Sequence, residues 1–183
     1  MSINIRLELL LSVLLPASLL ALPVGAVRLS NGQVAFNEPP QVVRAGASSV
    51  QASLPGTIYH FTITLPENAG ESMQAVTITQ RQNVENIAFE PEASRAFVGS
   101  SFRGSPMLSL ASVGGPRPTA NEVTLVFDPP VRPGSTVTVA LQARNPRYGG
   151  TYLFGVTAFP VGENGLGQFL GYSRLNFASP DGG

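Results

Sequence analysis

The fold is decided by the segment TIYHFTITL at residues 57–65. One face of this segment carries Tyr59, Phe61, Ile63 and Leu65, and the other carries His60, Thr62 and Thr64. Apolar and polar side chains that alternate with a period of two indicate a β-strand with one face in the core. We therefore expect residues 57–65 to form a half-buried strand.

The same alternation recurs in short runs that are rich in β-branched and aromatic residues. It is clearest in residues 75–80, 123–127 and 135–144. Further strands are expected at residues 33–36, 87–90, 95–98, 108–111, 151–159 and 169–177. No long window has a helical period, and the best candidate for a helical turn is residues 67–73.

Proline and glycine clusters separate these runs. Examples are Pro39-Pro40, Gly114-Gly115-Pro116, Pro129-Pro130 and Gly149-Gly150. Such pairs mark turns and strand edges. Roughly eight to ten short strands with frequent turns predict an all-β fold, an antiparallel β-sandwich of immunoglobulin-like character. A small outer-membrane β-barrel is the structural alternative, although its strands need about ten unbroken residues.

The N-terminal segment has the features of a signal peptide. Arg6 precedes an apolar run at residues 9–22, and Val24-Gly25-Ala26 then resembles a cleavage site. We expect a signal-peptide helix at residues 1–26 and a single β-sandwich domain at residues 27–183. The apolar run is shorter than the roughly 20 residues that a spanning helix needs, so no stable membrane span is expected after processing.

Composition narrows the class of partner. The formal net charge is +0, and the 11 basic residues are scattered along the chain, so no binding to nucleic acid is expected. The chain has no cysteine, which is unusual for a small exported domain and excludes disulfides and thiolate chemistry. The sandwich must therefore be stable through packing alone.

Tyr152 is a candidate for a corner that is typical of immunoglobulin-like domains. It lies in the sequence Gly150-Thr151-Tyr152-Leu153-Phe154, two residues ahead of an expected core side chain. In such domains a tyrosine near the start of the strand before the last donates a hydrogen bond back to the upstream chain. We expect Tyr152 to have this role.

Several motifs resemble one known family. They are TYLFGVTAFP at residues 151–160, GQFLG at residues 167–171 and FDPPV at residues 127–131. Together these motifs resemble the cyanobacterial secreted domain-of-unknown-function family 2808, over roughly residues 34–177. Gly165 departs from the resemblance, which implies proline there. The resemblance implies an exported protein of a Gram-negative photosynthetic cell, in the periplasm or at the cell surface, and it assigns no catalytic or binding residue.

The residues that catalysis requires are few. His60 is the only histidine and lies in the middle of a strand, where a solvent-facing or hydrogen-bonded role is the simpler interpretation. Glu90 and Glu92 flank Pro91 and are the one close carboxylate pair considered for glycoside hydrolysis. A calcium cage needs six to eight oxygen ligands, and the chain has only two aspartates, Asp128 and Asp181. We expect no enzyme activity, no cofactor and no metal.

Exposed aromatic side chains are the best binding candidates. Tyr148 and Tyr172 could stack against sugar rings, with Arg147 and Arg174 beside them. The function that the sequence favours is a non-enzymatic binding or structural module of the cell envelope, which contacts its partner through sheet edges and loops. That partner is an envelope protein or a surface polysaccharide. The alternatives are a glycan-binding or carbohydrate-active protein and the small barrel.

Overall fold

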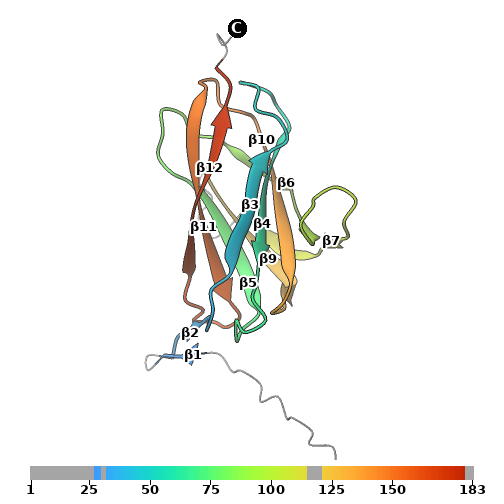
Figure 1. Cartoon of the computed structure of the whole chain (residues 1–183), viewed down its shortest axis with the longest axis vertical. Coiled ribbons are helices and arrows are strands. Elements are labelled where there is room, and N and C mark those ends of the chain that lie inside the picture. The colour runs from blue at the N-terminus through green and yellow to red at the C-terminus, as the bar shows by residue number, and fades with distance from the viewer. Residues whose placement is uncertain (1–26, 30–31, 115–120, 180–183) are drawn as a thin grey trace, which may run out of the picture.

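A computed structural model describes residues 27–29, 32–114 and 121–179, which form two stacked β-sheets (Figure 1). The expected signal-peptide helix at residues 1–26 lies outside the described residues, as does most of the proline-rich cluster after Gly114. In the described part of the chain, no helix has the length and apolar character that crossing a membrane requires.

Each sheet has five antiparallel strands, and we call them sheet I and sheet II. The order in sheet I is β3 (Gln41–Ala47), β4 (Thr57–Thr64), β10 (Thr136–Ala143), β6 (Phe89–Val98) and β7 (Met107–Leu108). The order in sheet II is β12 (Gln168–Phe177), β11 (Gly150–Pro160), β5 (Met73–Gln80), β9 (Glu122–Val131) and β8 (Leu110–Val113). A small ribbon of β1 (Val27–Arg28) and β2 (Val34–Ala35) lies below both sheets in Figure 1.

Seven of these strands have the arrangement of an immunoglobulin constant domain. Strands β3, β4, β10 and β6 correspond to A, B, E and D of one sheet, and β12, β11 and β5 correspond to G, F and C of the other. Strands β7, β8 and β9 are therefore an insertion between D and E. The predicted all-β, antiparallel and immunoglobulin-like sandwich is confirmed.

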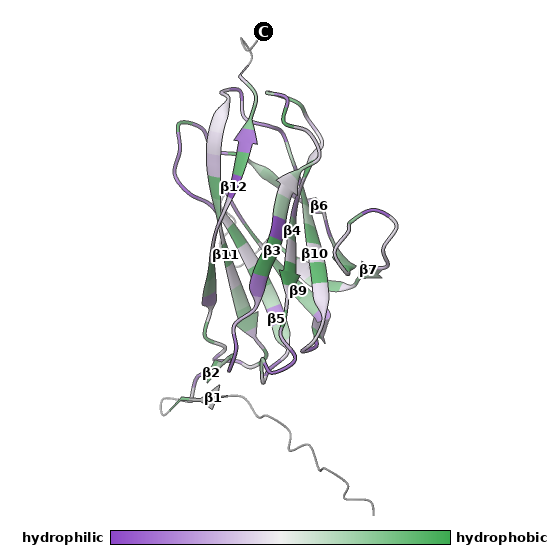
Figure 2. Cartoon of the chain, in the orientation of Figure 1, coloured by the Kyte–Doolittle hydropathy of each residue, from purple (hydrophilic) through white to green (hydrophobic). Residues whose placement is uncertain are grey.

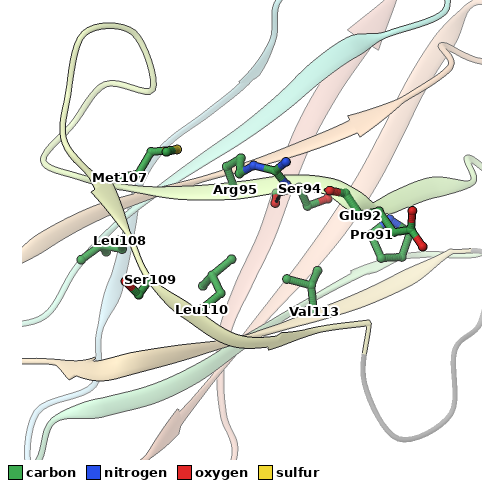
Figure 3. A pocket seen from close by; sticks show the side chains of 9 residues that line it. All are labelled: Pro91, Glu92, Ser94, Arg95, Met107, Leu108, Ser109, Leu110 and Val113. Atoms are coloured by element: carbon green, nitrogen blue, oxygen red, sulfur yellow. Dashed lines mark hydrogen bonds between the residues drawn. The ribbon is translucent and has the colours of Figure 1, made fainter.

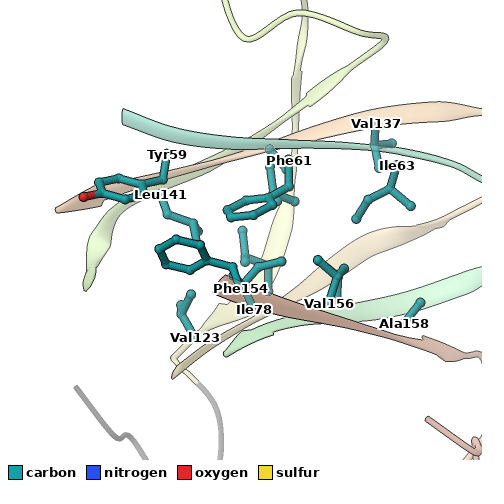
Figure 4. Close-up of a cluster of buried hydrophobic side chains, with 14 of the residues drawn as sticks. Tyr59, Phe61, Ile63, Ile78, Val123, Val137, Leu141, Phe154, Val156 and Ala158 are labelled. Carbon is teal, nitrogen blue, oxygen red and sulfur yellow. The ribbon is translucent and has the colours of Figure 1, made fainter. Parts of the chain in front are cut away.

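The core lies between the two sheets and is built around aromatic side chains (Figure 4). Tyr59 and Phe61 of β4 and Phe154 of β11 are completely or almost completely buried. The ring of Phe154 lies 5.8 Å from that of Tyr59 and 5.9 Å from that of Phe61, both edge to face, which is a favoured geometry for aromatic pairs. Strands from both layers carry the apolar residues of this core (Figure 2).

The predicted tyrosine corner is present. Tyr152 is buried near the start of β11, and its hydroxyl donates a 3.1 Å hydrogen bond to the carbonyl oxygen of Tyr148. Burial raises the pKa of Tyr152, and the negative charge of Glu85 raises it further. The prediction that Tyr152 closes this corner is confirmed.

The expectation that β4 is half-buried is wrong, because its polar face is covered as well. His60 is 8% exposed and Thr62 is completely buried. The hydroxyl of Thr62 shares a 2.9 Å hydrogen bond with that of Thr138, which in turn donates to the carbonyl of Gly99 at 2.8 Å. The loop at residues 99–106, between β6 and β7, lies over this face and covers it.

Other differences arise from irregular backbone. The expected strands at residues 87–90 and 95–98 form one strand, β6, and β9 continues through Pro129-Pro130 to Val131. Strand β3 was not expected, because a register shift after Val42 breaks its alternation. The helical turn expected at residues 67–73 is wrong, since a tight turn there leads directly into β5 at Met73.

Candidate functional site

A groove runs between β6 and the inserted strands β7 and β8 (Figure 3). Its volume is about 610 Å³, and a second hollow of about 840 Å³ adjoins it and shares part of its wall. We call the first of these, the 610 Å³ groove, the edge groove. Its lining consists of Pro91, Glu92, Ser94, Arg95, Met107, Leu108, Ser109, Leu110 and Val113. Both the edge groove and the second hollow are larger than three other hollows of the described residues, which measure 320 Å³ or less.

The groove exists because the chain leaves sheet I early. Strand β7 pairs with β6 only at Ala96 and Phe97. The chain then crosses at Ser109 to sheet II, where β8 pairs with β9. As a result, residues 89–95 of β6 have no strand partner on the side away from β10 in the described part of the chain. Such an unpaired edge is a template for another strand.

The floor of the groove is apolar. Leu108, Leu110 and Val113 are partly buried and pack against the core, and Leu110 and Val113 project toward β6 (Figure 3). Met107 is 67% exposed at one end of the floor. Methionine adapts its shape to its contacts, and it is common at surfaces that bind other chains. The floor can therefore bury further apolar surface.

The rim of the edge groove is polar, and hydrogen bonds from the Arg95 side chain to the nearby main chain fix its shape. Arg95 lies opposite Ala140 and Glu90 lies opposite Gln142, so residues 91–94 bulge out of the sheet. The Nη1 atom of Arg95 donates to the carbonyl oxygens of Glu92 and Ser94, at 2.7 Å each. This bulge disfavours edge-to-edge aggregation, and it leaves side-chain contacts as the main means of recognition.

The structure separates the four binding residues that the sequence suggested. Tyr172 and Arg174 lie exposed on β12, where Tyr172 is opposite Gly155 of β11. Tyr148 and Arg147 are exposed in the turn before β11. Because Gly150 and Gly155 are five positions apart on one strand, the two tyrosines lie roughly 15 Å or more apart along it. They do not form one platform.

Tyr172 instead belongs to a different group, the aromatic cluster of Phe169, Tyr172 and Arg81. The two rings lie 5.1 Å apart at an interplanar angle of 69°, and the guanidinium carbon of Arg81 is 5.6 Å from the Tyr172 ring centre. Gly155 lies beneath them, since a Cβ atom there would be 3.2 Å from Phe169. The cluster exposes two aromatic faces on the outer surface of sheet II.

Sequence periodicity could not find this cluster. Phe169 and Tyr172 are three positions apart, which places them on opposite faces of a regular strand. A bulge corrects this, because Val156 is opposite Gly171 whereas Thr157 is opposite Phe169, which leaves Leu170 unpaired. The one local signal is Gly171 beside the bulge, which has a φ of 108°, because a glycine inside a strand often marks a bulge.

Glu90 and Glu92, the carboxylate pair considered for glycoside hydrolysis, both line the second hollow beside the edge groove. Glu90 accepts a 2.6 Å hydrogen bond from the side-chain amide of Gln142, and Glu92 lines the edge groove. Within the described residues, no three histidine, aspartate or glutamate side chains gather in a way that would hold a metal ion.

Comparison with known proteins places the chain in a family. The sequence model of a family described as "Protein of unknown function (DUF2808)" matches residues 33–177. The chain belongs to this family. The family resemblance expected from the motifs at residues 127–131 and 151–171 is thereby confirmed, while the cyanobacterial origin stays a prediction. No curated protein matches the chain.

Several solved structures of bacterial proteins are similar to this chain. The collagen-binding subdomain ACE19 of the Enterococcus faecalis surface protein ACE is 11% identical, with a TM-score of 0.43 over 73% of this chain and 94% of that one. The C-terminal domain of the Streptococcus agalactiae AgI/II polypeptide BspA is 11% identical, with a TM-score of 0.44 over 78% of this chain and 51% of that one. A collagen-binding domain from a Staphylococcus aureus adhesin is 8% identical, with a TM-score of 0.37 over 67% of this chain and 88% of that one.

Proposed function

We propose that this member of the DUF2808 family is an exported, non-enzymatic binding module of the cell envelope. In this proposal residues 27–183 are the mature domain, in the periplasm or at the cell surface of a cyanobacterium. The edge groove binds an extended segment of another envelope protein. The observation that carries the proposal is the unpaired edge of β6 at residues 89–95, which faces an apolar hollow.

The shape and chemistry of the groove favour an extended polypeptide. Strand β7 occupies only the end of the β6 edge, at Ala96 and Phe97, so a bound segment would lie in line with β7, and the bulge at residues 91–94 makes side-chain contacts its main means of recognition. Extended peptides that bind at a sheet edge combine main-chain contacts with pockets for alternate side chains. Here the pockets are apolar, and Glu92 and Arg95 supply one charge of each sign at the rim.

The floor can supply useful affinity. Complete burial of a methionine side chain stabilises a complex by about 1.5–3 kcal/mol, and Met107 has most of its surface still to bury. Each 1.4 kcal/mol changes an affinity tenfold. Loss of the Met107 contact should therefore weaken binding by roughly tenfold or more.

Site-specific crosslinking in the native cell tests this proposal. A photoreactive amino acid is placed at Met107, and the control position is Val84, which is 78% exposed and lies outside the groove. We expect position 107 to crosslink to one segment of one envelope protein, and mass spectrometry identifies that segment. A synthetic peptide of the segment should then bind the protein, with at least about tenfold weaker binding to Met107→Glu than to Val84→Glu. Equal crosslinking from both positions, or equal affinities of both variants, would contradict the proposal.

A second candidate function is glycan binding by the aromatic cluster. Phe169 is 50% exposed and Tyr172 is 55% exposed, and Arg81 lies over the tyrosine ring. Exposed rings beside polar groups are what sugar recognition requires. A screen against envelope polysaccharides should show binding that Tyr172→Ala abolishes and that Tyr148→Ala, at the distant turn, does not. Binding to no polysaccharide, or equal loss in both variants, ends this candidate.

A further inference from the structure

A polar hollow of about 230 Å³ lies on the outer face of sheet I, away from the edge groove. It forms where the loop at residues 99–106 covers β3 and β4, and its lining consists of Arg44, Ser48, His60, Ser100, Ser101, Phe102 and Arg103. We call it the arginine pocket. Phe102 is the one apolar side chain in this lining, and the lining has no carboxylate.

His60 forms the base of the arginine pocket. Its imidazole lies over β3 at Gly46, where a Cβ atom would be only 2.8 Å from Cε1, and its ring centre is 5.1 Å from that of Phe102. The side chain is more than nine-tenths buried, yet its Nδ1 atom has no hydrogen-bond partner among the described residues. A buried polar atom without a partner is costly, and a bound water or ion is one of the explanations for such an atom in native proteins.

Two cations face the pocket without a counter-charge. Arg44 projects from β3 and Arg103 from the covering loop, and no carboxylate lies within ion-pair distance of either guanidinium in the described part of the chain. The Arg103 guanidinium carbon lies 5.5 Å from the Phe102 ring centre, which orients it. Burial lowers the pKa of His60, and the charges of Arg44 and Arg103 lower it further. All the charged groups that affect His60 are therefore positive.

Hydrogen-bond donors complete the pocket. The hydroxyl oxygen of Ser48 accepts a 3.0 Å bond from the N–H of Ile58, so its own proton remains available to a ligand. Ser101 is used differently, because its hydroxyl donates to the carbonyl of Arg103 and accepts from the N–H of Arg103. These two bonds hold the turn that presents Arg103.

We propose that the arginine pocket binds one oxyanion group (a carboxylate, sulfate or phosphate) between Arg44 and Arg103. Guanidinium groups match such oxygens with paired, charge-assisted hydrogen bonds. The Ser48 hydroxyl donates a further bond. The negative charge of the ligand opposes the effect of the two arginines on His60, so binding and protonation of His60 favour each other. This site is independent of the edge groove and of the function proposed for it.

The single histidine makes the test direct. His60 supplies one imidazole Hε1 signal in the proton NMR spectrum. Sodium sulfate, phosphate or acetate is added to the full mature chain, while sodium chloride holds the ionic strength constant. We expect a saturable shift of this signal for at least one anion, and a pKa of His60 that rises when that anion is bound. Comparison of the three anions identifies the preferred group, and glucuronate and glucose 6-phosphate then test whether a sugar can carry it.

Matched variants distinguish a site from a general effect of salt. Arg44→Ala and Arg103→Ala should each weaken binding by about tenfold or more, because a charge-assisted hydrogen bond is lost. Arg44→Lys should restore part of the affinity, and Arg147→Ala, which removes an exposed arginine outside the pocket lining, should leave it unchanged. Shifts that never saturate, or equal losses in Arg44→Ala and Arg147→Ala, would overturn the proposal.

Discussion

Substitution of Asn145 by alanine should destabilise the fold more than its position outside any strand suggests. Asn145 is 1% exposed and lies two positions after the end of β10. Its Oδ1 atom accepts a 2.8 Å hydrogen bond from the hydroxyl of Tyr59. Its Nδ2 atom donates to the carbonyl oxygens of Ser49 at 3.0 Å and Gln51 at 2.8 Å. One side chain thus ties the turn before β11 to the loop between β3 and β4.

The size of the effect follows from what Asn145→Ala leaves unpaired. The Tyr59 hydroxyl is completely buried, and a buried group without its partner costs about 1–3 kcal/mol. The carbonyls of Ser49 and Gln51 are nearer to solvent, so water compensates for most of their loss. We expect a total of about 3 kcal/mol, a large part of the 5–15 kcal/mol that typical domains have. The melting temperature should fall by about 6–12 °C.

Urea and thermal unfolding of the mature chain measure this loss. Asn68→Ala is the control, since Asn68 is exposed in a turn, and its effect should stay within about 0.5 kcal/mol. Tyr59→Phe removes the same bond from the other side. The losses of Tyr59→Phe and Asn145→Ala should therefore not add in the double variant, with a coupling of about 1 kcal/mol. A loss below 1 kcal/mol for Asn145→Ala, or strict additivity, would refute the reasoning.

Three further outcomes are expected. Gly46→Ala would place a Cβ atom 2.8 Å from the His60 ring, which packs against Phe102, so the free energy of unfolding should fall by about 1–3 kcal/mol. An unchanged melting temperature would show that the His60 ring can move aside. Because the pKa of His60 is lowered in the folded state, the unfolded state takes up protons first, and the free energy of unfolding should fall as the pH decreases below 6.5. His60→Gln should reduce this dependence just below pH 6.5, and an unchanged slope there would exclude His60 as its cause. Tyr152→Phe should cost about 1 kcal/mol in urea unfolding through loss of the bond to Tyr148, and a cost near zero would mean that water replaces it.

The sequence predicted those parts of the fold that obey simple periodicity. The alternation of Tyr59, Phe61 and Ile63 places them in the core because a strand with period two has one inner face. Tyr152 was predictable for a similar reason, as the corner depends on residues close together in the chain. In both cases the determining interactions are local, or they depend only on which face of a strand is buried.

The parts that the sequence did not reveal depend on distant segments. The polar face of β4 is buried because the loop at residues 99–106 lies over it, and nothing within residues 57–65 indicates that cover. Phe169 joins Tyr172 only because of the bulge at Leu170. Similarly, the run at residues 108–111 resembles one strand, but the chain crosses between the sheets at Ser109. The apolar side chains on either side therefore form the floor of a groove.

Both proposed sites depend on the segment inserted between β6 and β10, and this raises the question of whether they are one site. The edge groove uses Met107 and the following strand, whereas the arginine pocket uses the preceding loop up to Arg103. Their linings have no residue in common. We therefore expect Met107→Glu to leave the anion titration of His60 unchanged, and Arg103→Ala to leave peptide binding unchanged. If either variant affected both measurements, the insertion would act as one unit, and the pocket would serve to position the groove.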